Sequence, residues 1–229
     1  RALTIAQVAA LTTAQVAAME TADIASMATN RIAALTTSQI AQGLSTDQIA
    51  AMGVAQIASM TTKQLAQGLT TAQMVSFSTA QIVALSTTQL AALTTTNLQV
   101  METDDLAALT TAQLLGLTTI QISQGLSTDQ IIALTTSQVS NLMTAQIAAL
   151  TTAQVAAIET TDLQALKTTQ IAALKTTQVA AFTTEQIVAL TSSQIVSLSG
   201  LPIASLTTAQ IASLETTDLA VLKSTQIAA

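Results

Sequence analysis

The 229-residue chain contains no cysteine, histidine, tryptophan or tyrosine, and it has only two phenylalanines and one proline. Without cysteine there is no disulfide and no thiolate nucleophile, and without histidine there is no imidazole base. The lack of both removes the usual ligands of zinc. We therefore predict no catalytic residue, no metal site and no bound cofactor, and we do not expect an enzyme.

Charge and long apolar runs are scarce as well. Six basic and twelve acidic residues give a net charge of −6, and the basic residues are scattered, so we expect no nucleic-acid binding. Threonine or glutamine interrupts each apolar run long before about 18 residues, which argues against membrane insertion. Two phenylalanines are too few for an ordinary globular core of this length, so the core should be thin and repetitive.

An eight-residue repeat fills the chain. Units of the type Leu-Thr-Thr-Ala-Gln-Ile-Ala-Ala begin at residues 3, 11, 19, 27, 35 and 44 and continue to the unit at residue 222, giving 28 units. Three of them carry a ninth residue, Gly43, Gly68 or Gly125. Residues 1–229 are therefore predicted to form a single repeat array, and because the chain starts with Arg1 we expect it to be part of a longer polypeptide.

Each position of the unit has its own character. Positions 1 and 6 are apolar in every unit, position 3 is Thr or Ser in 25 units, and position 5 is Gln in 21. The other residues at position 5 are Asp23, Arg31, Asn97, Asp105, Asp162, Pro202 and Asp218. Positions 1 and 6 should fill the interior, while positions 2 and 4, which vary most and hold most of the charge, should face solvent. The glutamine should form hydrogen bonds between coils or to corner carbonyls.

The repeat predicts short helices separated by breaks. Two apolar residues per eight give a period of about 4.0, and a continuous α-helix turns every 3.6 residues, so the apolar stripe would drift around it. A helix of about five to seven residues cannot stand alone in water and must be stabilised by its neighbours. We predict an all-α solenoid, a superhelical spiral with one short helix per repeat and several repeats per coil. Near-identical units at intervals of 3, 7 and 10 suggest about 3.3 to 3.5 units per coil if like units stack.

The ends of each helix can also be predicted. The first Thr and the Gln have the spacing of a capping box, but position 3 is the more uniform site, so we predict position 3 as the usual N-cap. Gly43, Gly68 and Gly125 fall where helices end and are expected to be left-handed C-cap residues. Gly200 and Pro202 mark one irregular unit.

Four acidic pairs and seven methionines are the other features that could suggest a site. The pairs are Glu20/Asp23, Glu102/Asp105, Glu159/Asp162 and Glu215/Asp218. They lack the oxygen-rich loop of a calcium site and the partner base of a catalytic pair, so we interpret them as solvated first-turn charges. Met19, Met52 and Met74 are expected in the core, and Met143 on the surface.

The unit Leu-Thr-Thr-Ala-Gln-Ile-Ala-Ala resembles octapeptide arrays of large bacterial secreted or surface exoproteins, which are often described as adhesins, hemagglutinin-like or heme-utilisation proteins. The resemblance implies export, attachment at a cell surface and a stalk or fibre role. Because this segment has no His, Cys or Tyr, it offers none of the usual axial ligands for heme.

Two functions are compatible with the array. The first is a structural repeat domain, namely a spacer, stalk or filament-forming subunit of a secreted or cell-surface bacterial protein. Its partners would be other copies joined end to end or neighbouring parts of a longer chain, because neither terminal unit resembles a polar cap. The alternative is a repetitive binding surface for an extended ligand, a receptor or ice, which the rows of threonine would provide.

Overall fold

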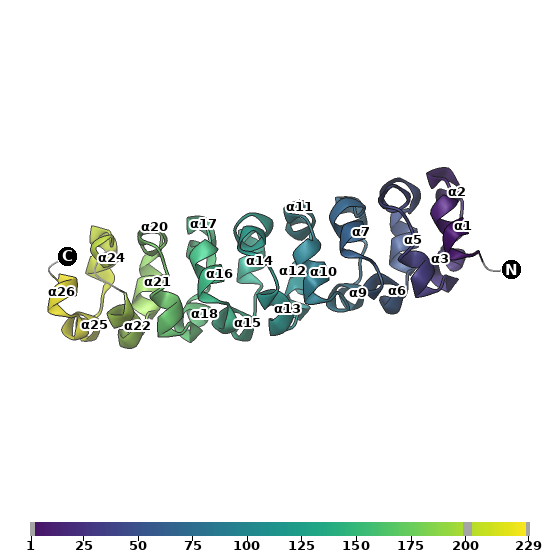
Figure 1. Cartoon of the computed structure of the whole chain (residues 1–229). Helices are drawn as coiled ribbons and strands as arrows, with labels where there is room; N and C mark the ends of the chain where they lie inside the picture. Colours follow the sequence, from purple (N-terminus) through teal and green to yellow (C-terminus); the bar gives the residue numbers. More distant parts are fainter. Residues whose placement is uncertain (1–2, 199–202, 228–229) are drawn as a thin grey trace. The chain divides into compact units, whose positions relative to one another are not determined.

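The computed structural model describes residues 3–198 and 203–227, and within these residues every regular element is helical. The chain divides into two compact units, residues 1–117 and 118–229. Each unit is a spiral of short helices, with successive coils lying side by side (Figure 1). This confirms the predicted all-α solenoid with one helix per repeat. The irregular repeat expected around Gly200 and Pro202 lies outside the described residues.

The helices have four to six residues, slightly fewer than expected. The first unit contains α1 (Ile5–Ala10), α2 (Thr13–Ala17), α3 (Thr21–Ser26), α4 (Thr29–Ile32), the π-helix η1 (Gln39–Gly43), α5 (Thr46–Ala51), α6 (Val54–Ala58), α7 (Thr62–Gln67), α8 (Thr71–Val75), α9 (Thr79–Val83), α10 (Thr87–Ala92), α11 (Thr95–Gln99), α12 (Thr103–Ala108) and α13 (Thr111–Leu115).

The second unit repeats the same arrangement. It contains the π-helix η2 (Gln121–Gly125), α14 (Thr128–Ile132), α15 (Thr136–Asn141), α16 (Thr144–Ala149), α17 (Thr152–Ala157), α18 (Thr160–Ala165), α19 (Thr168–Ile171), α20 (Thr176–Val179), α21 (Thr184–Ala189), α22 (Ser192–Ser197), α24 (Thr208–Ser213), α25 (Thr216–Val221) and α26 (Ser224–Ile227).

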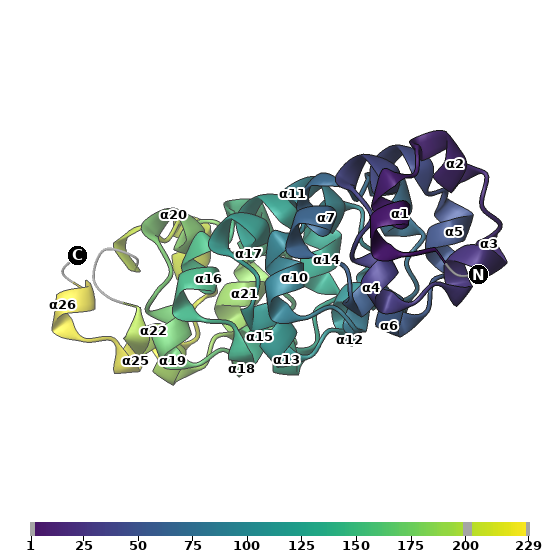
Figure 2. The same ribbon diagram turned by 45° about the vertical axis from the view of Figure 1, so that its right-hand side comes forward.

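Each coil consists of three repeats. In both units the helix of one repeat packs on the helix three repeats further along, as in the pairs α1·α4, α7·α10 and α18·α21. Figure 2 shows the successive helices winding round these coils. The prediction of about 3.3 to 3.5 repeats per coil was therefore wrong. Near-identical repeats at intervals of 7 and 10 do not stack on one another, so their likeness carries no information about the coil.

The interior of each coil is made by positions 1 and 6. Ile57 and Leu65, both at position 6, are fully buried, and Met60 and Phe77 at position 1 are 3 % and 5 % exposed. The step from position 6 to the next position 1 is three residues, so the two side chains lie on the same side of the chain as it turns the corner. Position 1 is less buried in the first coil, where Leu3 is 36 % exposed. The predicted core positions are confirmed.

The N-cap is position 2, not position 3 as predicted. In α7, Thr61 has an extended backbone and its hydroxyl accepts from the backbone N–H of Gln64, while the Gln64 side chain accepts from the Thr61 N–H. This is the capping box, and the regular glutamine at the third helical residue fixes its position. Thr at position 3 is instead the first helical residue.

Some repeats lack a side-chain acceptor at the cap, and Met143 provides a test of its contribution. Met143 is 47 % exposed and makes no side-chain cap bond to α16. We expect Met143→Thr to raise the free energy of unfolding by about 1 kcal/mol, because the new hydroxyl can accept from the helix N-terminus. Urea denaturation followed by circular dichroism measures this. Valine has the shape of threonine but no hydrogen-bond acceptor, so Met143→Val should give no such gain. An equal gain from both variants would refute the role of the cap.

Two of the nine-residue repeats absorb their extra residue within a π-helix, η1 or η2, whereas Gly68 is the C-cap of α7. Gly43 ends η1, and Leu44 N–H bonds to Gln39 O at 2.9 Å, a five-residue step typical of a π-helix. None of the described glycines has a positive φ, so the prediction of left-handed C-caps was wrong for Gly43, Gly68 and Gly125. At Gly43 a glycine suits close packing instead, because a Cβ there would lie 3.0 Å from the Cβ of Val16 in the preceding coil.

Candidate functional site

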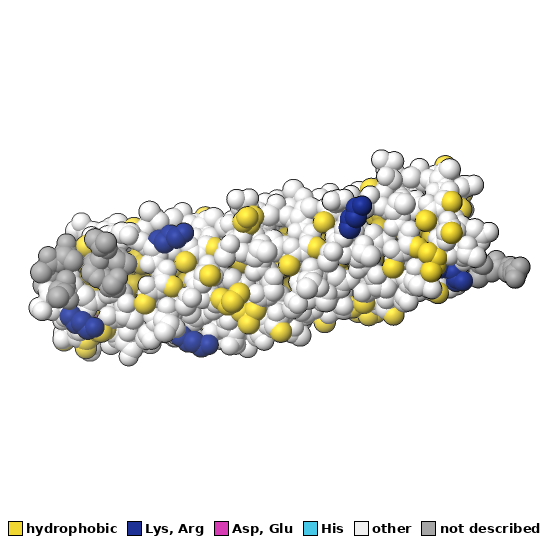
Figure 3. All heavy atoms as spheres, in the orientation of Figure 1, with side chains coloured by type: hydrophobic (Ala, Val, Ile, Leu, Met, Phe, Trp, Pro, Cys, Tyr) yellow, Lys and Arg dark blue, Asp and Glu magenta, His cyan; other side chains and the backbone are white. Residues whose placement is uncertain are grey.

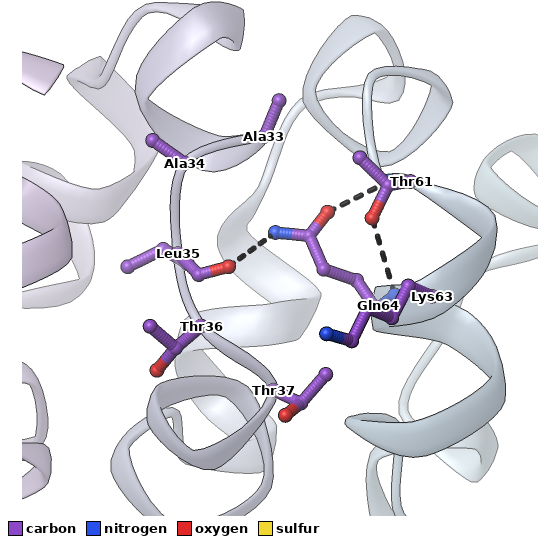
Figure 4. Close-up of a pocket in the computed structure, with 8 residues that line it drawn as sticks. All are labelled: Ala33, Ala34, Leu35, Thr36, Thr37, Thr61, Lys63 and Gln64. Atoms are coloured by element: carbon purple, nitrogen blue, oxygen red, sulfur yellow. Dashed lines mark hydrogen bonds between the residues drawn. The ribbon is translucent and has the colours of Figure 1, made fainter.

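The most regular buried polar side chain of the molecule is the glutamine at position 5, and Gln64 shows its geometry (Figure 4). Its side-chain Oε1 accepts from the Thr61 N–H at 2.7 Å. Its Nε2 donates to Ile32 O at 2.9 Å and to Leu35 O at 2.7 Å, two carbonyls at the corner directly beneath it in the preceding coil. One amide therefore closes its own helix cap and joins two coils.

The same joint recurs through both units. In each case Nε2 reaches backbone carbonyls between 28 and 33 residues earlier in the chain. The glutamines that donate in this way include Gln39, Gln48, Gln56, Gln73, Gln81, Gln89 and Gln113 in the first unit and Gln154, Gln170, Gln178, Gln186, Gln194, Gln210 and Gln226 in the second. We name this row of side chains the glutamine ladder. It confirms the prediction that glutamine bonds between coils.

Two residues that replace glutamine preserve part of the ladder. Asn97 is 2 % exposed, and its Nδ2 donates to Leu69 O at 3.2 Å. Arg31 belongs to the second coil, and its Nε donates to Leu3 O at 2.6 Å in the first. In both residues a side-chain N–H reaches the position-1 carbonyl three repeats earlier. Both sites therefore retain a side-chain N–H that donates to the preceding coil.

Three aspartates at position 5 contradict the prediction of solvated charge pairs. Asp105, Asp162 and Asp218 are only 7 %, 3 % and 4 % exposed, because position 5 faces the preceding coil. The Asp218 carboxylate accepts from the Ser192 hydroxyl at 2.7 Å. Asp23 stays exposed, since it lies in the first coil. The glutamate of each pair occupies the exposed N-cap, as predicted for solvent-facing position 2; these are Glu20, Glu102, Glu159 and Glu215.

A shallow hollow lies at the corner that Gln64 closes. It is lined by Ala33, Ala34, Leu35, Thr36, Thr37, Thr61, Lys63 and Gln64 (Figure 4). Lys63 is its only ionic side chain, and it stands exposed on the first turn of α7. The Gln64 amide is already used in the ladder. The hollow thus has no nucleophile paired with a base, and it offers a ligand little beyond threonine hydroxyls and methyl groups.

A more apolar hollow lies in the last coil of the second unit. Its lining is Ile203, Ala204, Leu206, Ile211, Leu219, Leu222 and Gln226. Ile211 and Leu219 occupy position 6, which is almost completely buried elsewhere, yet each is 43 % exposed here. The hollow is therefore lined by side chains at positions that form the core in the other coils.

The remaining surface has few distinctive groups. On the face in Figure 3 the Lys and Arg side chains are isolated from one another and the apolar side chains are dispersed. Among the described residues no three acidic side chains gather where they could hold a metal ion. In the same residues no helix combines the length and apolar character required to cross a bilayer.

One surface carboxylate has a shifted pKa. Hydrogen bonds from its own backbone N–H and from the hydroxyls of Thr183 and Thr184 hold the pKa of Glu185 below its ordinary value. The unfolded chain therefore binds this proton more readily, so the carboxylate stabilises the fold above the ordinary glutamate pKa, and this contribution is lost as the pH falls through the lower folded pKa.

We therefore expect Glu185→Gln to be slightly destabilising at neutral pH, with a difference from the unchanged chain that disappears in acid. Urea midpoints measured for both proteins across that range test this expectation. A difference that persists below the folded pKa would assign the effect to packing rather than to charge.

The geometry places this chain among α-solenoids with three short helices per coil. The sequence matches the ALTTAQ repeat family over residues 16–54, 67–95, 98–136 and 155–200. The chain therefore belongs to the ALTTAQ repeat family.

Comparison with other known proteins adds little to this assignment. No curated protein is similar in sequence. Among solved structures, the leucine-rich repeat-containing protein LegL7 from Legionella pneumophila aligns over 86 % of this chain and 77 % of its own, with 8 % identity and a TM-score of 0.25. A TM-score of 0.25 is too low to support an inference about fold or function.

Proposed function

We propose that this array is a structural repeat domain, acting as a spacer, stalk or filament-forming part of a bacterial secreted or cell-surface protein. The glutamine ladder is the observation that carries the proposal. The regular buried polar side chain of the repeat is used to join coil to coil, as Gln64 does through Ile32 O and Leu35 O. A solenoid built in this way can be lengthened by adding equivalent coils, each stabilised by its neighbours.

The surface chemistry supports a non-enzymatic role. The hollow beside Lys63 holds no paired nucleophile and base, and the ladder amides are occupied by backbone groups. The resemblance to octapeptide arrays of large exoproteins supports the surface location. Immunogold labelling of intact cells of the source organism, using antibodies against this chain, tests that location. We expect label outside the envelope without permeabilisation; label that appears only after permeabilisation would overturn it.

A binding surface is the competing function, and one observation favours it. Because helices three repeats apart stack, exposed threonines at position 3, such as Thr62 and Thr87, recur once per coil on each side of the spiral. Such rows could meet an extended ligand or an ice surface. A thermal-hysteresis measurement on the purified chain separates the two functions. We expect none for a spacer, and clear activity would replace the spacer by an ice-binding role.

A further inference from the structure

Three buried aspartates occupy the position at which the glutamine ladder places a hydrogen-bond donor. Asp105, Asp162 and Asp218 lie at position 5, and the side chain of each is more than nine-tenths buried. Among the described residues no group donates to the carboxylate of Asp105 or Asp162. A carboxylate has only acceptor atoms, so its burial without a donor is unfavourable unless a positive charge lies beside it.

The corner of the preceding coil adds a backbone oxygen at each of these joints. Gln186 donates to the position-1 carbonyl 28 residues earlier, Ile158 O, at 2.7 Å. The same register assigns one such carbonyl to each aspartate, and the pairs are Asp105 with Phe77 O, Asp162 with Leu134 O, and Asp218 with Leu190 O. Within the described part of the chain no donor reaches any of these three carbonyls. Each joint therefore brings a carboxylate and a carbonyl together without a hydrogen between them.

Asn97 shows how close the two groups come. Asparagine has the size of aspartate, and Asn97 lies at position 5 with its Nδ2 atom 3.2 Å from the corresponding carbonyl, Leu69 O. In an aspartate the atom in place of Nδ2 is a second oxygen. Two oxygens that bind one calcium ion, each at about 2.3–2.6 Å, lie about 3 to 3.5 Å apart. The spacing found at Asn97 therefore suits two ligands of one cation when both atoms are oxygens.

The joint at Asp218 shows the direction of the carboxylate and provides a third oxygen. Asp218 Oδ1 accepts from the Ser192 hydroxyl at 2.7 Å, and Ser192 follows Leu190 by two residues in the preceding coil. The carboxylate is therefore turned toward that corner. A hydroxyl also has lone pairs, so the Ser192 oxygen can rotate to bind a cation. The joints of the other two aspartates have Thr79 and Thr136 at the place of Ser192.

We propose that each of these three joints binds a calcium ion, which replaces the glutamine donor and links the aspartate carboxylate to a corner carbonyl of the preceding coil. All the ligands are oxygens, as hard cations prefer. A single carboxylate suits a weak site, with a dissociation constant of about 10⁻⁴ to 10⁻³ M. Calcium accepts an irregular set of ligands, whereas magnesium demands a near-ideal octahedron and releases its water reluctantly, so calcium fits better.

This site uses oxygens that the local sequence does not contain. The pair Glu159/Asp162 was not expected to bind calcium because its own loop has few oxygen ligands. In the solenoid, Leu134 O and the Thr136 hydroxyl belong to the preceding coil, 28 and 26 residues before Asp162. The joint between coils therefore supplies what the loop lacks. The inference goes beyond the structural role proposed above and does not depend on it.

Calcium titration of the purified chain tests the proposal. After a chelating resin has removed divalent ions, isothermal titration calorimetry with CaCl₂ should show three equivalents of bound calcium. Millimolar CaCl₂ should raise the urea midpoint, because the ion binds the folded chain, and the same concentration of MgCl₂ should raise it less. A chain that binds no calcium, or whose midpoint responds equally to the two salts, would overturn the proposal.

Restoring the glutamine identifies the ligand. Asp162→Gln introduces the Nε2 donor that the other joints use, so we expect a folded chain with a higher urea midpoint in chelator and one equivalent of calcium fewer. Asp129→Asn is the matched control, since it removes the charge of an exposed aspartate in the same unit. Glu159→Gln removes the exposed member of the acidic pair. Both of these variants should retain three equivalents.

The variants also define the contrary results. Loss of an equivalent in Glu159→Gln or Asp129→Asn, but not in Asp162→Gln, would assign binding to exposed carboxylates and overturn the proposal. The triple variant Asp105→Gln/Asp162→Gln/Asp218→Gln should bind no calcium, and unchanged binding would overturn the proposal as well. Circular dichroism verifies that each variant is folded, and Asp105→Gln alone repeats the measurement at an independent joint.

Discussion

Replacing Gln64 by glutamate is expected to lower the free energy of unfolding by more than about 3 kcal/mol at neutral pH. Gln64 is 3 % exposed, and its Nε2 donates to Ile32 O and Leu35 O at 2.9 and 2.7 Å. A carboxylate could still accept from the Thr61 N–H, but its second oxygen would face two carbonyl oxygens with no proton between them. A buried charge without a partner is costly, and the two carbonyls would also lose their donor.

The pH dependence of this variant has a definite sign. Burial against carbonyl oxygens disfavours the charged form, so the pKa of the introduced carboxyl should be higher in the folded chain than in the unfolded chain. Its protonated form can donate to a carbonyl. The destabilisation of Gln64→Glu should therefore be smallest below the unfolded pKa and should grow as the pH rises through the folded pKa.

Gln7→Glu is the matched control for this prediction. Gln7 occupies the same position of the repeat, but it is exposed, and among the described residues its Nε2 has no acceptor. The same substitution there should change stability by less than about 0.5 kcal/mol, as expected for surface sites. Urea denaturation of both variants at neutral and acidic pH provides the measurement. An equal loss in Gln7→Glu and Gln64→Glu would show that the inter-coil bonds contribute little.

Gly68→Ala should lower stability by about 2 kcal/mol, because the extra methyl group has no space. A Cβ at Gly68 would lie 2.8 Å from Gln64 O and 3.1 Å from the Cα of Thr37 in the preceding coil. Both contacts are to backbone atoms, so relief requires the backbone to move rather than one side chain to rotate: within α7 for Gln64 O, and between coils for Thr37.

Gly53→Ala tests whether it is space rather than glycine itself that matters. A Cβ at Gly53 would meet only the Oε1 of Gln56, at 3.7 Å, and the backbone there suits any residue. The loss of chain entropy in the unfolded state favours alanine, and the N-cap preference favours glycine, so the net change should stay within about 0.5 kcal/mol. Comparable losses in the two variants would mean that close packing at Gly68 is unimportant.

Much of the fold could be predicted from the repeat because its features are local and recur. The apolar period that no continuous helix can satisfy predicted one short helix per unit, and the burial of positions 1 and 6 followed from it. The role of glutamine followed from chemistry, since a uniform polar residue between apolar positions needs partners. Repetition strengthened each of these inferences, because one environment had to suit all units.

The features that were predicted wrongly depend on contacts between coils or on a choice between two equivalent residues. Two adjacent threonines are both acceptable caps, and only their spacing to Gln64 selects Thr61. The conformation at Gly43 depends on its approach to Val16, which lies in another coil. Burial of Asp162 likewise depends on the coil beneath it, because the sequence around it resembles that around exposed Asp23.

The glutamine ladder also determines the order in which the array can fold during synthesis. Each Nε2 of the ladder donates to carbonyls of residues 28 to 33 positions nearer the N-terminus. During synthesis the acceptors of a joint therefore leave the ribosome before its donor, and each new repeat can complete its bonds on a coil that already exists. Such a chain can fold behind its growing end, one repeat at a time, with no need to wait for its C-terminus.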